Sequence, residues 1–114
     1  MNKIELVGRL ARDPELKLIE STGKKVCNFT LAVSRSFVNL NGEKEADFIP
    51  IVVWGKIAET VSLYVKKGGL IGVTGRLQIR SFDTKEGNRK YVTEVVGEQV
   101  IFLDTKKDDI GEIV

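Results

Sequence analysis

Apolar and polar residues alternate along much of the chain, most clearly between Asp47 and Trp54. Side chains of a β-strand point alternately to its two faces. One face of this strand is aliphatic, and the other begins and ends with a ring: the first holds Ile49, Ile51 and Val53, and the second holds Phe48, Pro50, Val52 and Trp54. Such a strand is typical of a doubly buried core, but rings opposite an aliphatic face are also typical of a surface that stacks bases.

Other stretches alternate in the same way and predict further strands. Residues 3–10 alternate with Gly8 at mid-strand, which indicates a bend or bulge. Residues 26–35 pair an apolar face with a face of small polar residues that leaves room for a ligand. Residues 91–96 and 100–103 form the end of the pattern, with a predicted break at Gly97.

The strand predicted over residues 70–82 carries the strongest chemical signal. One face is mainly aliphatic and includes Leu77 and Ile79. The other carries Arg76, Arg80 and Phe82. Cations beside a ring are what a groove for single-stranded nucleic acid needs, since cations bind phosphates and a ring stacks on a base.

A helical period interrupts the strands after Trp54. Apolar residues recur at Ile57, Val61, Tyr64 and Val65, which predicts a short amphipathic helix over residues 56–65 with Tyr64 in the core. Lys66 and Lys67 are expected in its last turn, before a stop at Gly68. Residues 36–46 and 83–90 are predicted to be long polar loops.

Composition excludes several classes of function. The chain has 114 residues, no histidine and one cysteine, so it offers neither a histidine base nor a Cys/His zinc site nor an internal disulfide. Cys27 is expected in the core, and a reducing cytoplasmic setting fits. Neither a membrane span nor a signal peptide is recognisable. We expect no enzyme activity, no cofactor and no metal.

The net charge of +2 is small for a protein that binds nucleic acid. Residues 1–103, however, contain 16 basic and 12 acidic residues, a net charge of +4, and the acidic excess lies in residues 104–114. A mildly basic body can bind a polyanion if its cations line one groove.

These elements predict one all-β domain over residues 1–103 and a short acidic tail over residues 104–114. Five strands with one short helix between the third and fourth match the five-stranded oligonucleotide/oligosaccharide-binding (OB) barrel. Its two long loops would lengthen a binding groove, and its mid-strand glycines would supply curvature.

Several sequence blocks, taken in order, carry a resemblance to a known family. They are Asn2-Lys3-Ile4-Glu5-Leu6-Val7-Gly8-Arg9-Leu10, Asp13-Pro14-Glu15, Phe29-Thr30-Leu31-Ala32-Val33-Ser34, Phe48 with Val52-Val53-Trp54-Gly55-Lys56-Ile57-Ala58-Glu59, Tyr64 with Lys67-Gly68, Val73 with Gly75-Arg76-Leu77, and Tyr91 with Thr93-Glu94-Val95. Through these blocks, residues 2–103 resemble the bacterial-type single-stranded DNA-binding protein family.

The resemblance implies sequence-independent binding and protection of single-stranded DNA in replication, recombination and repair. It implies base stacking at four positions, all aromatic in this chain: Phe37, Phe48, Trp54 and Phe82. It also implies a homotetramer built from dimers, in which strands equivalent to residues 3–10 pair across an interface.

Six cations are our candidates for phosphate contact: Arg9, Arg35, Lys56, Arg76, Arg80 and Arg89. The chain departs from the family at its end, because Asp108 and Asp109 resemble an acidic tip but no Pro-Phe pair follows them. Recruitment of replication and repair proteins through this tail is therefore open. Two alternative functions on the same fold are a primosomal-type protein adaptor and an RNA-binding chaperone.

Overall fold

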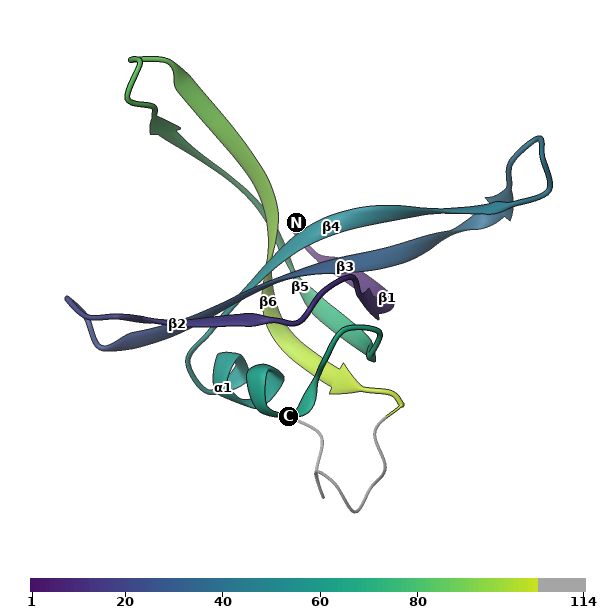
Figure 1. Cartoon of the computed structure of the whole chain (residues 1–114), viewed down its shortest axis with the longest axis horizontal. Helices are drawn as coiled ribbons and strands as arrows, with labels where there is room; N and C mark the ends of the chain where they lie inside the picture. The colour runs from purple at the N-terminus through teal and green to yellow at the C-terminus, as the bar shows by residue number, and fades with distance from the viewer. Residues whose placement is uncertain (105–114) are drawn as a thin grey trace.

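The computed structural model describes residues 1–104, which form one six-stranded sheet curled into a barrel (Figure 1). The elements are β1 (Ile4–Leu10), β2 (Glu15–Ile19), β3 (Lys24–Val38), β4 (Lys44–Trp54), α1 (Gly55–Tyr64), β5 (Leu70–Asp83) and β6 (Arg89–Phe102). The strand order is β1-β5-β6-β4-β3-β2. Arg9 and Leu10 of β1 also pair with β3, and this contact closes the barrel.

The predicted all-β barrel is confirmed, with two differences in its elements. Residues 15–19 form a strand of their own, paired with the start of β3, so there are six strands and the helix follows the fourth. The predicted loops are also much shorter, because β3, β4, β5 and β6 continue past the barrel as two long hairpins. We call residues 34–48, which are mostly exposed, the β3–β4 arm, and the similarly exposed residues 77–93 the β5–β6 arm (Figure 1).

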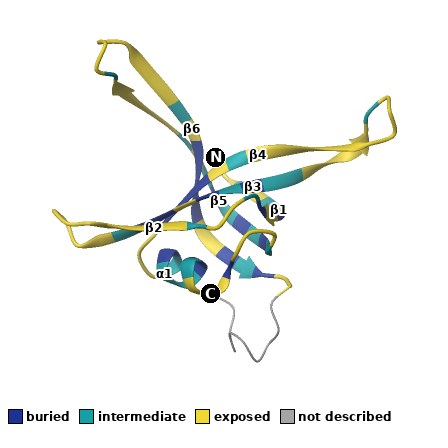
Figure 2. Cartoon of the chain, in the orientation of Figure 1, coloured by how far each residue is buried: buried dark blue, intermediate teal, exposed yellow. Residues whose placement is uncertain are grey.

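The core lies where the long strands cross (Figure 2). Alternation placed most of it correctly, because every second residue of β3 and β4 points inward. The aliphatic face of β4 is buried at Ile51 and Val53, and Phe29 and Leu31 of β3 pack beside it. Cys27 is fully buried, as predicted.

Two glycines permit the close crossing of strands. A Cβ at Gly8 would overlap the carbonyl oxygen of Ala32, and one at Gly75 would overlap the carbonyl oxygen of Val96. The predicted break at Gly97 is wrong, since β6 runs through it. The ladder of β5 and β6 instead shifts by one residue there, because Thr74 pairs with Gln99 while Gly75 pairs with Gly97. This β-bulge bends the sheet without ending the strand.

The helix closes the lower end of the barrel in Figure 1, with Ala58 and Val61 buried against the core. It ends at Tyr64, one residue earlier than predicted, so the lysines at 66 and 67 follow the helix. Tyr64 is not in the core: its side chain is partly exposed and meets the ring of Phe102 edge-on, with centroids 6.5 Å apart. No helix in residues 1–104 is long and apolar enough to cross a membrane.

Two further differences in burial concern the β5–β6 arm and strand β4. Leu77 and Ile79 were predicted on the core face of their strand, and they do share its parity, yet they are 42% and 62% exposed. Both belong to the β5–β6 arm, most of which is exposed (Figure 2). Val52 shows the opposite error: it shares a face with Phe48 and Trp54 but is buried against Val26 and Val96.

Candidate nucleic-acid interface

Strand β4 presents two of the predicted stacking rings. Phe48 is 65% exposed and Trp54 is 45% exposed. Their even numbering places both on the strand face opposite Ile51 and Val53. Val52 lies between them on the same face and is buried. The rings therefore stand at the two ends of one strand face.

Strand β3 extends this surface with small side chains. Ala32 lies opposite Phe48, Thr30 opposite Pro50, and Asn28 opposite Val52. Residues paired directly across a sheet share a face, so this row runs beside the rings without covering them. A cavity of about 190 Å³ opens here. Among its lining residues are Asn28, Thr30, Pro50 and Arg12.

The register carries the same face into the β5–β6 arm. Val52 pairs with Val96 of β6, and Val96 pairs with Arg76 of β5. Arg80 and Phe82 follow Arg76 with the same parity, and Phe82 is 47% exposed. The structure thus brings three predicted rings and two predicted cations onto one continuous face of the sheet, which we call the ring face.

Phe37, the fourth predicted ring, is placed differently. It is 69% exposed near the end of β3. The pairing of β3 with β4 shifts between Ser34 and Val38, so Phe37 lies within an irregular segment. Simple alternation along the strand therefore does not assign Phe37 to a face.

Both arginines of the ring face are already paired with carboxylates. Nε of Arg80 donates to Oε1 of Glu94 at 2.6 Å, and Glu94 is buried. Arg76 donates to the side-chain oxygen of Gln78 at 3.2 Å and lies 3.9 Å from a carboxylate oxygen of Glu98. A phosphate that binds these cations must compete with acceptors that the protein supplies.

Two other predicted cations lie on the reverse faces of the arms. Arg89 pairs directly with Asp83 in the ladder, with Nε 3.4 Å from Oδ1. Arg35 donates to Glu45 and Asp47 of β4. The hydrogen bonds between Arg35 and Asp47 hold the pKa of the Asp47 carboxyl below its usual range. They also raise the pKa of the Arg35 guanidinium.

Arg9 and Lys56 are the remaining candidates. Arg9 is on the outer face of β1, where it donates to the carbonyl oxygen of Gly68 at 2.8 Å and to Asp104 at 3.1 Å. Lys56, in the first turn of α1, lines a cavity of about 900 Å³ beside Trp54. Lys25 in this cavity forms an ion pair with Glu59 and thereby lowers the pKa of the glutamate.

Two lysines on the ring face were not among the residues predicted from the sequence. Lys90 lies directly opposite Phe82. Lys17 lies opposite Val26, which in turn lies opposite Trp54. The pairing registers of the strands place both lysines on this face. In the sequence, only the turns that set these registers could have indicated their position.

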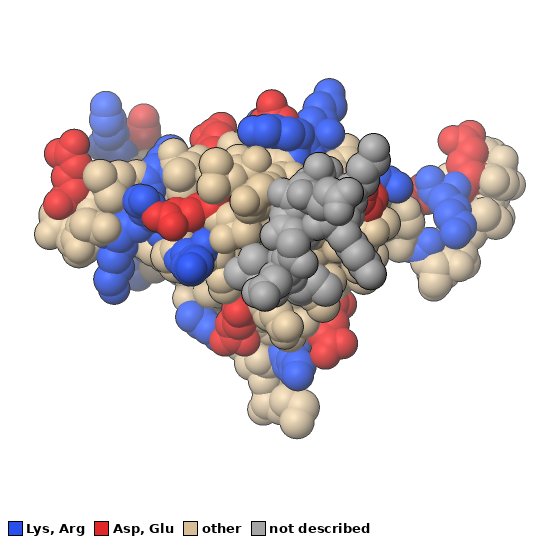
Figure 3. Space-filling model, turned by 90° about the horizontal axis from the view of Figure 1, so that it is seen from below, with Lys and Arg blue, Asp and Glu red and all other residues tan. Residues whose placement is uncertain are grey.

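Figure 3 shows charged side chains of both signs on the face of the molecule that it presents. Residues 1–104 contain no cluster of acidic, histidine or cysteine side chains that could hold a metal ion. Burial, with a smaller effect from Glu15, raises the pKa of the Cys27 thiol to about 11, so this thiol is protonated at neutral pH.

Comparison with known proteins adds an independent result. Residues 1–103 match the Single-strand binding protein family. Single-stranded DNA-binding protein 1 of Clostridium acetobutylicum is 60% identical over 110 residues, which cover 96% of this chain and all of the relative. Single-stranded DNA-binding protein 1 of Staphylococcus aureus is 55% identical over 109 residues, covering 96% of this chain and 69% of the relative.

Proposed function

The chain belongs to the single-strand binding protein family, and from this premise we propose that it binds single-stranded DNA on the ring face without sequence preference. The observation that carries the proposal is the register through β4, β6 and β5. This register supports a single surface that holds Phe48, Trp54 and Phe82 together with Arg76 and Arg80. Stacking is tolerant of sequence because every base has a π-face.

When DNA binds, the arginines of this face exchange their carboxylate partners for phosphate groups. Phosphate oxygens replace Glu94 and Glu98 as acceptors for Arg80 and Arg76. Lys17, Lys56 and Lys90 add charge near the rings. Arg9 and Arg35 stay candidates for phosphate contact, whereas Arg89, on the reverse face of the β5–β6 arm, is expected to make none. Each arginine contributes less net affinity than a free cation would, because its bond to phosphate replaces an existing bond to a carboxylate.

The action that we propose is not catalytic. Bases stacked on Phe37, Phe48, Trp54 and Phe82 cannot pair with a complementary strand, so the bound DNA stays single and covered. This is the state of DNA that replication, recombination and repair require. The cytoplasm of a bacterial cell is the compartment that fits this function.

We propose a homotetramer as the working assembly. Support comes from β1, which pairs with β5 from Ile4 to Arg9 but with β3 only at Arg9 and Leu10. The other edge of its first half therefore has no partner strand in the described chain, and such an edge can pair with a second copy. Asp108 and Asp109, for which recruitment of partner proteins was left open, lie outside the described residues.

A competition experiment tests the proposed function. Fluorescence anisotropy of a labelled oligo(dT) reports binding, and matched unlabelled single-stranded DNA, duplex DNA and RNA serve as competitors. We expect single-stranded DNA to compete best. Equal competition by RNA would favour an RNA chaperone, and no binding of any strand at low salt would favour a protein adaptor.

A further inference from the structure

The position of Phe37 raises a structural problem, because regular strand pairing does not hold it. The β3–β4 ladder is regular from Val26 to Ser34 and resumes only at Val38, which pairs with Lys44. A regular ladder fixes the direction of each side chain. Across this irregular segment, another interaction has to define where the ring points.

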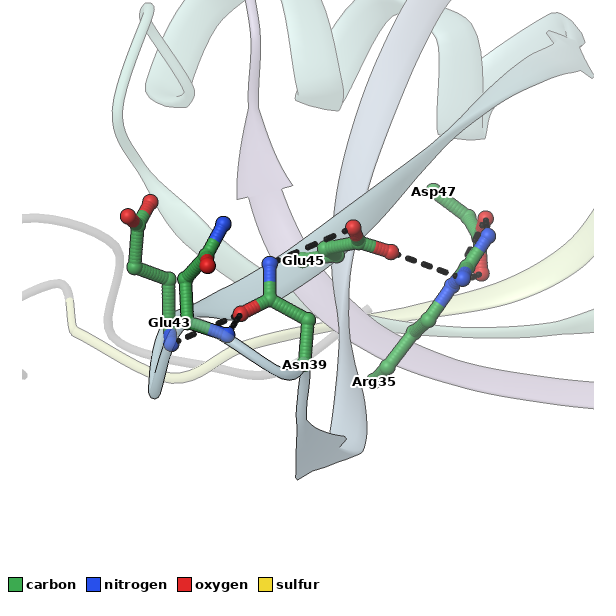
Figure 4. A network of polar contacts seen from close by, with 6 residues as sticks. Arg35, Asn39, Glu43, Glu45 and Asp47 are labelled. Atoms are coloured by element: carbon green, nitrogen blue, oxygen red, sulfur yellow. Dashed lines mark hydrogen bonds and ion pairs between the residues drawn. The ribbon is translucent and has the colours of Figure 1, made fainter.

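A polar network spans the irregular segment on the β3–β4 arm (Figure 4). Arg35 donates through Nη1 to Glu45 at 2.9 Å and through Nη2 to Asp47 at 2.9 Å. On the far side of the segment, Nδ2 of Asn39 donates to the second carboxylate oxygen of Glu45 at 3.4 Å. Glu45 therefore links Arg35, two residues before Phe37, to Asn39, two residues after it.

The Asn39 end of the network is itself anchored to the turn. Its Oδ1 accepts the backbone N–H groups of Asn41 and Glu43, at 2.9 and 3.0 Å. Its own N–H donates to the carbonyl oxygen of Glu43 at 2.8 Å. Asn39 is thus held by the turn, and Arg35 is held by Asp47 (Figure 4).

We propose that Glu45 is a positioning residue for Phe37, and that the Arg35–Glu45–Asn39 bridge orders the ring for base stacking. This inference rests on the proposed function. The side chains of Arg35 and Glu45 are 43% and 50% exposed, and ion pairs this exposed add little to global stability. Their effect is local: a preordered ring loses less conformational freedom when a base stacks on it.

The arm offers a matched control in Glu43. Glu43→Ala and Glu45→Ala each remove one carboxylate from the same hairpin, so their long-range electrostatic effects on a polyanion are similar. The carboxylate of Glu45 joins the bridge. The carboxylate of Glu43 makes no hydrogen bond or ion pair within residues 1–104, where only its backbone takes part.

Affinity for oligo(dT), measured for each variant with and without Phe37→Ala, tests the proposal. We expect Glu45→Ala to weaken binding by about threefold, from the ordering cost of one side chain. Glu43→Ala is expected to cause no loss. In the Phe37→Ala background Glu45→Ala should cause no further loss. A loss that persists without the ring, or equal effects of the two glutamate variants, would overturn the proposal.

Amide hydrogen exchange of the free protein separates this inference from the proposed function. Glu45→Ala should accelerate exchange at residues 36–38, whereas Glu43→Ala should leave it unchanged. If the parent protein binds no DNA, the proposed function fails, and the exchange result still tests the bridge. Unchanged exchange in Glu45→Ala would show that Glu45 does not order this segment.

Discussion

The barrel and its two arms are built from the same strands but differ in how deeply residues of the same parity are buried. In the barrel, one strand face meets the core, so Leu31 is fully buried. In the β5–β6 arm the same parity continues, yet Leu77 is 42% exposed because nothing packs over it. Alternation fixes the direction of a side chain, and a second layer of structure decides whether it is buried.

The same difference explains where the ring face can exist. The barrel has only one face available to a ligand, because the other is filled by the core. The arms add length to that face and carry Phe37, Phe48 and Phe82. The barrel therefore supplies stability, and the arms together with the outer face of β4 supply the binding surface.

The largest expected effect comes from removing the same side chain in the two regions. Leu31→Ala should lower the free energy of unfolding by about 2–5 kcal/mol, because it leaves a cavity in the core. Leu77→Ala should lower it by less than about 1 kcal/mol, since that side chain is already partly solvated. Urea unfolding followed by circular dichroism measures both.

The unfolding result for Leu77→Ala also tests whether the face of the β5–β6 arm is uncovered in solution. If Leu77→Ala costs as much as Leu31→Ala, the arm face is covered in solution by a second copy of the chain. Light scattering on the two variants would then show whether the assembly has changed.

A second prediction concerns a residue whose loss should weaken DNA binding but leave stability nearly unchanged. Phe48→Ala should weaken oligo(dT) binding by about tenfold, because one stacked base is worth ~1–3 kcal/mol. Its unfolding free energy should change little, since the ring is 65% exposed. Parallel binding and unfolding measurements check this, and a variant that binds normally would remove Phe48 from the interface.

A third prediction compares the two faces of one arm. Arg80→Gln should reduce the slope of log affinity against log salt by about 0.7, the value for one phosphate contact to a single strand. Arg89→Gln, on the reverse face beside Asp83, should leave the slope unchanged. Salt titrations of the two variants decide the matter: equal slopes would contradict the assignment of the faces.

The last prediction concerns the core at high pH. Burial raises the pKa of Cys27 to about 11, whereas a thiol in an unfolded chain has a pKa of about 8.5. Between these values the folded state binds more protons, so stability falls as pH rises. Cys27→Ala should flatten this fall in pH-dependent urea unfolding, and an unchanged slope would contradict it.

Much of the fold and part of the site could be predicted because strand parity is local. Alternation placed Phe48 and Trp54 on one face of β4, and Arg76 and Phe82 on one face of β5. It could not distinguish Arg89 from Lys90, since adjacent residues face opposite ways and the strand register decides which lies opposite Phe82.

Two other residues show why the rest could not be predicted. Val52 is buried because neighbouring strands supply Val26 and Val96, and contacts of that kind depend on long-range pairing. The guanidinium of Arg35 is turned toward Glu45 and Asp47, two partners that alternation along β3 does not reveal. Both outcomes depend on which residues the pairing of strands brings together, and alternation within one strand does not encode that.

The most direct test of the ring face is the fluorescence of Trp54, the only tryptophan of the chain. Its indole is 45% exposed on that face. If bases stack on it, titration with oligo(dT) at low salt should quench its emission strongly and to saturation, and Trp54→Phe should abolish the signal while most binding remains. Tight binding of oligo(dT) with no change in Trp54 emission would contradict base stacking on the ring face.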